Sequence, residues 1–244
     1  QNNKLVREIT SERDNSFISY NGGPSSEPVL SNKDGLNRFV WDSRHSSLSG
    51  VPYAYIEGSF RGHKAIPGKY NLTLVVGETS YNSEFEILKN PNFSVSDEDY
   101  LDLDKYATHM ENNFNEMAKY INSNKELMDK LGVLVKELDE NPEVKENGKK
   151  LLELMDNWDK KMMQRMSKAY DDVENFPNKF LADYLFILDE IKGDIPNVSE
   201  GILKSLKSHD EKWVELKKEI DVINQVSIPE YNKELWSIGI GALN

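Results

Sequence analysis

The sequence contains no cysteine, which excludes disulfide bonds, thiolate metal ligands and cysteine nucleophiles together. No stretch approaches the roughly 18 consecutive apolar residues that a membrane-spanning helix requires. The sequence also has no glycine-rich phosphate loop, no nucleophile elbow and no Ser/His/Asp set. We therefore predict no catalytic residue, no cofactor and no metal ion, and we interpret the chain as a non-enzyme.

Histidine is scarce as well, with four residues, at positions 45, 63, 109 and 209. The charged neighbours of His109 and His209 predict solvated helix surfaces for both. His45 and His63 fall in predicted loops that could approach each other. No carboxylate accompanies either of them at a metal-binding spacing along the sequence, so we do not predict a metal site there.

The acidic residues are unevenly placed. Residues 1–93 hold ten basic residues (Lys and Arg) and ten acidic residues (Asp and Glu), so their charges cancel. Residues 94–244 hold the other twenty basic and thirty-two acidic residues, and therefore the whole net charge of −12. A region this acidic repels nucleic acid and anionic lipid, and neither is expected as a partner. Its first aspartates lack the glycine and the final glutamate of a calcium loop, so they predict a solvated first helical turn: Asp97, Asp99, Asp102 and Asp104.

Short apolar segments with turn signals between them dominate residues 1–93. The predicted strands cover residues 3–10, 35–42, 53–56, 70–76 and 81–88. Strands at such intervals indicate an antiparallel β-sandwich, and the first of them looks like an inner strand, which points to a missing edge strand. The predicted core face carries Phe39, Trp41, Tyr70, Leu72 and Leu74. If Trp41 is buried there, Trp41→Ala should unfold the sandwich at a cost of about 3–5 kcal/mol.

Helical periodicity replaces alternation in residues 94–244. One helix of about 45 residues is predicted from Ser96, provided that Asn122-Ser-Asn124 does not break it. Further helices are predicted at 144–173, at 180–191, from Asn197 and from Ser227, joined by short loops as in an elongated antiparallel bundle. Its predicted core includes Met110, Phe114, Trp158 and Trp213. The predicted fold class is therefore α+β, a sandwich followed by a bundle.

Several motifs resemble one family. Gly35-Leu-Asn-Arg-Phe-Val-Trp41-Asp, followed by Ile66-Pro-Gly-Lys-Tyr70, is similar to the Ig- or fibronectin-type-III-like domain that follows the β-propeller in exported sortilin-like (BNR-repeat) proteins of Bacteroidetes. Three later stretches resemble the helical region of the same family: Phe176-Pro-Asn-Lys-Phe-Leu181, Asp194-Ile-Pro196 and Glu230-Tyr-Asn232. The chain departs from the family pattern at Ser43-Arg-His45 and at Asn90-Pro-Asn92.

The resemblance implies a non-catalytic, exported structural or interaction segment of a larger protein. Its expected partners are a β-propeller upstream of Gln1 and a protein or glycan. One alternative is a carbohydrate-contacting accessory domain of a glycoside hydrolase, with aromatic contacts from Trp41, Tyr53, Tyr55 and Phe60. A second alternative is a stand-alone adhesion or interaction protein that dimerises through its long helices.

Overall fold

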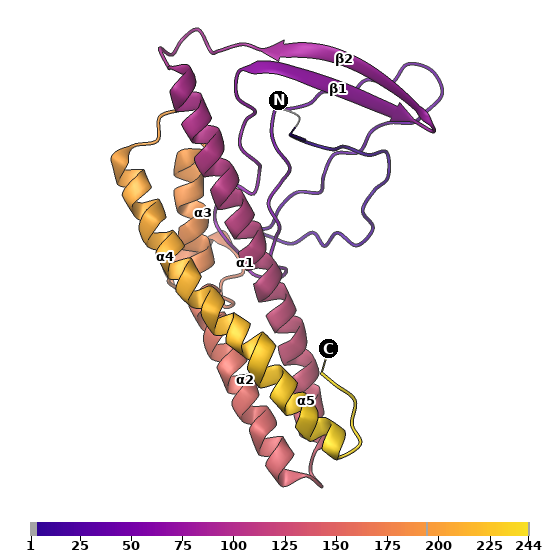
Figure 1. Cartoon of the computed structure of the whole chain (residues 1–244), viewed down its shortest axis with the longest axis vertical. Helices are drawn as coiled ribbons and strands as arrows, with labels where there is room; N and C mark the ends of the chain where they lie inside the picture. The colour runs from indigo at the N-terminus through magenta and orange to yellow at the C-terminus, as the bar shows by residue number, and fades with distance from the viewer. Residues whose placement is uncertain (1–3, 194, 244) are drawn as a thin grey trace.

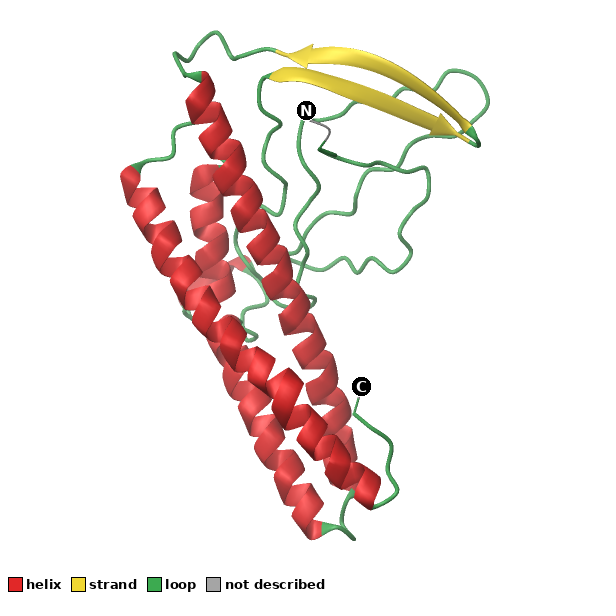
Figure 2. Ribbon diagram, viewed as in Figure 1, coloured by secondary structure: helices red, strands yellow, loops and turns green. Residues whose placement is uncertain are grey.

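A computed structural model describes residues 4–193 and 195–243, except for the side chain of Val173. In these residues five α-helices form a long bundle, and the chain before the first helix lies beside one end of that bundle (Figures 1 and 2). This N-terminal region contains one β-hairpin and is otherwise irregular over the described residues. The molecule is therefore mostly helical.

Helices α1 and α4 each pack against both α2 and α3. The bounds of the five helices are α1 Asp97–Glu137, α2 Pro142–Met162, α3 Phe180–Ile191, α4 Glu200–Val222 and α5 Ile228–Ser237. A 3₁₀ turn at Tyr170–Glu174 lies between α2 and α3.

The first helix, α1, runs unbroken for 41 residues and is about 60 Å long. A capping box fixes its start: Ser96 Oγ accepts the backbone N–H of Asp99, and the Asp99 carboxylate accepts the backbone N–H of Ser96. The Asn122-Ser-Asn124 stretch does not interrupt it. The Asn124 side chain donates to the Met155 carbonyl of α2 at 3.1 Å, so this polar residue serves packing between helices.

The second helix, α2, ends at Met162, well before residue 173, where the sequence predicted its end. The guanidinium of Arg165 turns back and donates two hydrogen bonds, of 2.6 and 2.7 Å, to the buried carboxylate of Asp159. Residues six apart in a continuous helix point to different sides, so this pair could not form there. The end of α2 at Met162 therefore allows Arg165 to pair with the buried carboxylate of Asp159.

The last two helices form one continuous rod through a π-helical turn, Ile223–Ser227. Pro229 lies in the first turn of α5 and cannot donate a backbone hydrogen bond to the turn before it, which the wider π turn accommodates. The separate helix predicted from Ser227 is thus a continuation of α4. The start of α4 also differs, because Ser199 rather than Asn197 caps it, accepting the backbone N–H of Ile202 at 3.3 Å.

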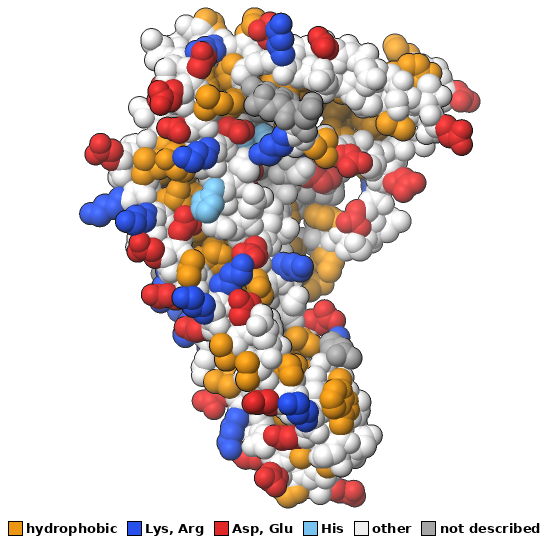
Figure 3. Space-filling model, in the orientation of Figure 1, with side chains coloured by type: hydrophobic (Ala, Val, Ile, Leu, Met, Phe, Trp, Pro, Cys, Tyr) orange, Lys and Arg blue, Asp and Glu red, His pale blue; other side chains and the backbone are white. Residues whose placement is uncertain are grey.

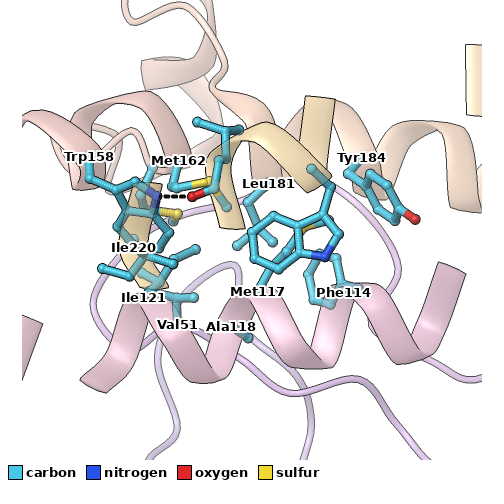
Figure 4. Close-up of a cluster of buried hydrophobic side chains, with 14 of the residues drawn as sticks. Val51, Phe114, Met117, Ala118, Ile121, Trp158, Met162, Leu181, Tyr184 and Ile220 are labelled. Atoms are coloured by element: carbon cyan, nitrogen blue, oxygen red, sulfur yellow. Dashed lines mark hydrogen bonds between the residues drawn. The ribbon is translucent and has the colours of Figure 1, made fainter. Parts of the chain in front are cut away.

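Large apolar side chains from all the helices fill the centre of the bundle (Figure 4). Trp158 is 1% exposed, and its indole N–H donates to the Leu216 carbonyl of α4 at 2.8 Å. The same core extends into the N-terminal region, where Val51 lies among the side chains of α1. Three further residues that the sequence placed in the core of the bundle are buried in it: Met110, Phe114 and Trp213.

The N-terminal region does not form the β-sandwich that the sequence predicted. Its regular sheet, within the described part of the chain, consists of β1 (Gly68–Val76) and β2 (Thr79–Ile87), an antiparallel pair with no third strand. The predicted strands at 35–42 and 53–56 are irregular, and so is 4–10, with residue 3 of that prediction outside the described residues. The prediction of an Ig-like or fibronectin-type-III-like fold was therefore wrong.

Segment 35–42 shows why its alternating pattern does not make a strand. Leu36 is 100% exposed and Val40 is 72% exposed on one face, and Phe39 on the predicted core face is 38% exposed, so no layer of the described residues fully covers either face. The side chain of Asn37 donates to the backbone carbonyls of Lys33 at 2.7 Å and Gly35 at 3.2 Å, local bonds that are typical of a turn and not of a paired strand. An alternating pattern of apolar and polar residues forms a strand only where another strand can pair with its edge and a further layer can cover its apolar face.

Candidate functional site

Two acidic side chains of α1 face the N-terminal region. Asp104 and Glu111 are two helical turns apart and so share one face of the helix. Glu111 is 8% exposed and lies next to Met110, which is fully buried. A carboxylate at such a position needs polar partners, because removing an unpaired charge from water is costly.

The partners come from two N-terminal segments that run antiparallel to each other. The backbone N–H of His45 donates to the His63 carbonyl at 3.0 Å, and the N–H of Ala65 donates to the Ser43 carbonyl at 2.7 Å. Gly62 permits this close approach, since a Cβ atom there would lie 2.5 Å from the His45 carbonyl oxygen. The pairing places the imidazoles of His45 and His63 together over α1.

Four side chains meet here and form what we call the His–carboxylate cluster: His45, His63, Asp104 and Glu111. The two imidazole rings stack with centroids 3.8 Å apart and planes 22° apart. His63 is fully buried, with Nδ1 2.9 Å from Glu111 Oε2 and Nε2 3.2 Å from Asp104 Oδ1. Glu111 Oε1 also accepts the backbone N–H of His63 at 2.7 Å, and His45 Nε2 lies 3.9 Å from Asp104 Oδ1.

Both ring nitrogens of His63 face carboxylate oxygens, which favours the protonated ring. Burial acts to lower the pKa of His63, but the hydrogen bonds to Asp104 and Glu111 outweigh it and raise that pKa above its usual value. The hydrogen bond from His63 is also the main reason that the pKa of Asp104 is lowered. Burial, together with the positive charge of His63, lowers the pKa of His45 to about 4, so His45 is neutral at neutral pH.

Sequence reasoning considered His45 and His63 but missed the acidic half of this cluster. Asp104 was interpreted as part of a solvated first turn, and Glu111 was not singled out. A signal was present, because Glu111 interrupts an apolar stripe between Met110 and Phe114. An acidic residue at the margin of a buried stripe indicates a buried polar partner, although its identity depends on the tertiary structure.

The other two histidines lie away from the cluster, on the bundle. His109 of α1 is about half exposed, and its Nε2 lies 2.7 Å from the Asp210 carboxylate of α4. His209 stacks on the ring of Phe180 with centroids 5.8 Å apart. Neither histidine meets a second one within the described residues.

The β1–β2 hairpin has one apolar and one polar face. The register sets Tyr70 opposite Phe85 and Leu74 opposite Tyr81, and residues directly opposite each other share a face. The base of this face is covered: Tyr70 is buried and stacks on Phe85 at 5.5 Å, and Trp41 meets Phe85 edge-on at 6.1 Å. The other face is mainly polar, with Lys69, Asn71, Thr73, Val75, Ser80, Asn82, Glu84 and Glu86.

Beyond its base the apolar face lies open, and we call this part the hairpin face: Leu72, Leu74, Val76 and Tyr81. Leu72 and Leu74, both predicted as core, are 57% and 48% exposed. Phe39, also predicted as core, is 38% exposed, and Trp41 is only partly buried. These assignments were wrong because no second sheet covers the hairpin among the described residues. Figure 3 shows hydrophobic side chains exposed along and beneath the hairpin.

No protein-family model, curated protein or solved structure matches this chain. Over the described residues, none of the helices is both long and apolar enough to cross a membrane. The motif resemblance to exported propeller proteins accordingly stays a prediction.

Proposed function

We propose that this chain is a non-catalytic interaction module that binds an extended polypeptide segment on its hairpin face. The observation that supports it is the exposure of apolar side chains on one face of an ordered sheet, where Val76 and Tyr81 are both 59% exposed alongside Leu72 and Leu74. Contiguous apolar surface of this kind marks interaction sites. The motif resemblance adds a candidate partner, a propeller domain of the same polypeptide, and an exported setting.

An extended segment fits this surface better than a helix. Neither outer edge of the hairpin is paired with a further strand in the described part of the chain. An added strand would supply hydrogen bonds to one edge and would set alternate side chains beside those of the hairpin face, as cross-strand neighbours. A helix would cover the apolar side chains but would leave both edges open. A two-stranded ribbon is marginally stable alone, so an added strand would also stabilise it.

The available free energy is sufficient for specific binding. Full burial of one leucine side chain stabilises by about 1.5–3 kcal/mol, and roughly half of that is still available at each half-exposed position. Each 1.4 kcal/mol changes a dissociation constant about tenfold. Leu72 and Leu74 together could therefore strengthen binding by roughly one to two orders of magnitude.

The two alternatives have less support. Of the four aromatic residues suggested for carbohydrate contact, Phe60 is 6% exposed, and the Trp41 indole N–H is occupied by the Arg44 carbonyl at 2.9 Å. Dimerisation through the long helices would need apolar stripes on their outer surfaces. The main stripes of α1 and α2 are instead buried inside the bundle.

Two adjacent substitutions on opposite faces of β1 test the proposal. Leu74→Lys places a charge on the hairpin face, whereas Val75→Lys places the same charge on the other face, at a side chain that is 63% exposed. A phage-displayed peptide library is selected on the wild-type chain, and the selected peptides are titrated against both variants. We expect peptides with alternating apolar residues, at least about tenfold weaker binding to Leu74→Lys, and little change for Val75→Lys.

Two results would contradict peptide binding on the hairpin face. If the wild type selects no such peptide, or if the two variants bind it equally, the hairpin face is not the binding surface. Sedimentation of the wild type alone provides a second test. A dimer that Leu74→Lys dissociates would mean that a second copy of this chain, and not another protein, covers the face.

A further inference from the structure

The His–carboxylate cluster brings potential metal ligands into one place. His45, His63 and Glu111 can each offer one ligand atom, and these atoms all lie within 4.8 Å of one another. Bonds of about 2.0–2.1 Å in a tetrahedral zinc site set neighbouring ligand atoms about 3.3 Å apart. His63 Nδ1 and Glu111 Oε2 are 2.9 Å apart, already close to that separation. The His45 ring, which stacks on His63, would turn out of the stack to direct a ring nitrogen at the same ion. We propose that these three residues bind a divalent transition-metal ion of the zinc type.

A second feature is independent of that spacing. A metal-binding histidine almost always donates its other ring N–H to a carboxylate, a backbone carbonyl or water, which fixes the orientation of the ring. With Nδ1 of His63 directed at Glu111, its Nε2 lies 3.2 Å from Asp104 Oδ1. Asp104 is thus a positioning residue for His63, and the backbone N–H of His63 bonded to Glu111 Oε1 holds the third ligand in place.

The donor atoms select the class of ion. Two imidazole nitrogens and one carboxylate oxygen suit Zn²⁺ and similar transition metals, whereas Ca²⁺ and Mg²⁺ prefer sites built from oxygen. Two carboxylates share the cluster, so it carries negative charge to balance a dication. A ligating imidazole must be neutral, so His63 would release its proton to solvent as the ion binds.

The ion would link two parts of the molecule. Both histidines belong to the N-terminal region, which is irregular around them, and Glu111 belongs to the first half of α1. Metal bonds between the two histidines and Glu111 would stabilise the irregular N-terminal segments, which have no regular sheet among the described residues to hold them in place. We therefore assign the ion a structural role, that of joining the N-terminal region to the bundle.

The test uses the full chain, stripped of metal with a chelator. Titration with ZnCl₂ is followed by calorimetry, and titration with CoCl₂ by visible absorption, which reports nitrogen and oxygen coordination directly. We expect one equivalent of either ion to bind, MgCl₂ to give no comparable signal, and zinc to raise the unfolding temperature.

Matched variants then locate the site. His45→Gln removes one ligand and leaves the His63–Glu111 contact intact. His109→Gln is the control, because His109 is a histidine that also contacts a carboxylate, that of Asp210 at 2.7 Å, but lies on α1 outside the cluster. Loss of a positioning carboxylate typically weakens metal binding about 10–100-fold, so we expect Asp104→Asn to do so, His45→Gln to exceed that, and His109→Gln to change little.

Equal zinc affinity in His45→Gln and His109→Gln, or no stoichiometric binding by the wild type, would overturn the proposal. The cluster would then be an ion-pair network that links the two regions without a metal. If His45→Gln fails to fold, Asp104→Asn decides the matter, because the Asp104 side chain is 31% exposed and tolerates an isosteric change. Unchanged zinc affinity and cobalt spectrum in that variant would count against the site.

Discussion

The bundle and the N-terminal region use the same side chain in different ways. Trp158 of α2 is 1% exposed, and its indole N–H reaches across to a carbonyl of α4. Trp41 of the N-terminal region is partly exposed, and its indole N–H reaches only the Arg44 carbonyl, three residues away in its own loop. The contrast shows that a large aromatic side chain becomes core only where several elements close around it.

The backbone explains the contrast. A helix satisfies its own hydrogen bonds, so an apolar stripe is free to pack on any neighbour that offers a matching surface. A strand must find another strand before its alternating side chains have a surface to cover. The helices around Trp158 pack by their apolar stripes in this way. Strand β1 has β2 as its partner, but no further layer covers their apolar face among the described residues.

The largest expected effect is in the bundle. Trp158→Ala should lower the free energy of unfolding by about 3–5 kcal/mol, because it opens a cavity between α2 and α4 and removes a buried hydrogen bond. Urea denaturation followed by circular dichroism measures it. A loss below about 1.5 kcal/mol would show that the surrounding helices collapse into the space, contrary to the tight packing seen here.

A smaller effect is expected from the matched tryptophan in the N-terminal region. Trp41→Ala removes one edge-on contact with Phe85 and one local hydrogen bond, so we expect a loss of about 1–2 kcal/mol. This is below the 3–5 kcal/mol that burial in a sandwich would have implied. The same denaturation experiment measures it, and a loss of 3 kcal/mol or more would mean that Trp41 supports far more of the fold than its contacts indicate.

The smallest effect is expected on the hairpin face. Leu74→Ala should change the free energy of unfolding by only about 0.5 kcal/mol, because the side chain is already half exposed. The matched control is Leu131→Ala on α1, where the side chain is 0% exposed and the expected loss is about 2–5 kcal/mol. Similar losses for the two leucines would remove the distinction between the covered and the uncovered regions.

Much of the helical part was predictable from the sequence. The Ser96 cap and the apolar stripe through Met110 and Phe114 depend on residues a few positions apart, and α1 begins and runs where they indicate. The end of α2 was not predictable, because it coincides with the bond between Arg165 and Asp159, which a reading of helical periodicity does not include. The β-sandwich was predicted wrongly. An alternating pattern shows which side chains share one face of a strand, but it does not show whether a second layer covers that face.

The candidate metal site was harder to predict from the sequence than the fold was. His45 and His63 were noted, yet Asp104 and Glu111 stand on a helix that begins more than thirty residues after His63, so no local spacing connects them. By itself the sequence determined the course of α1, the apolar stripes of the helices, the alternation along β1 and the positions of the histidines, because these depend on neighbours along the chain. Only the tertiary structure decided that the hairpin face stays open and that two histidines meet two carboxylates, because such contacts join residues far apart in sequence.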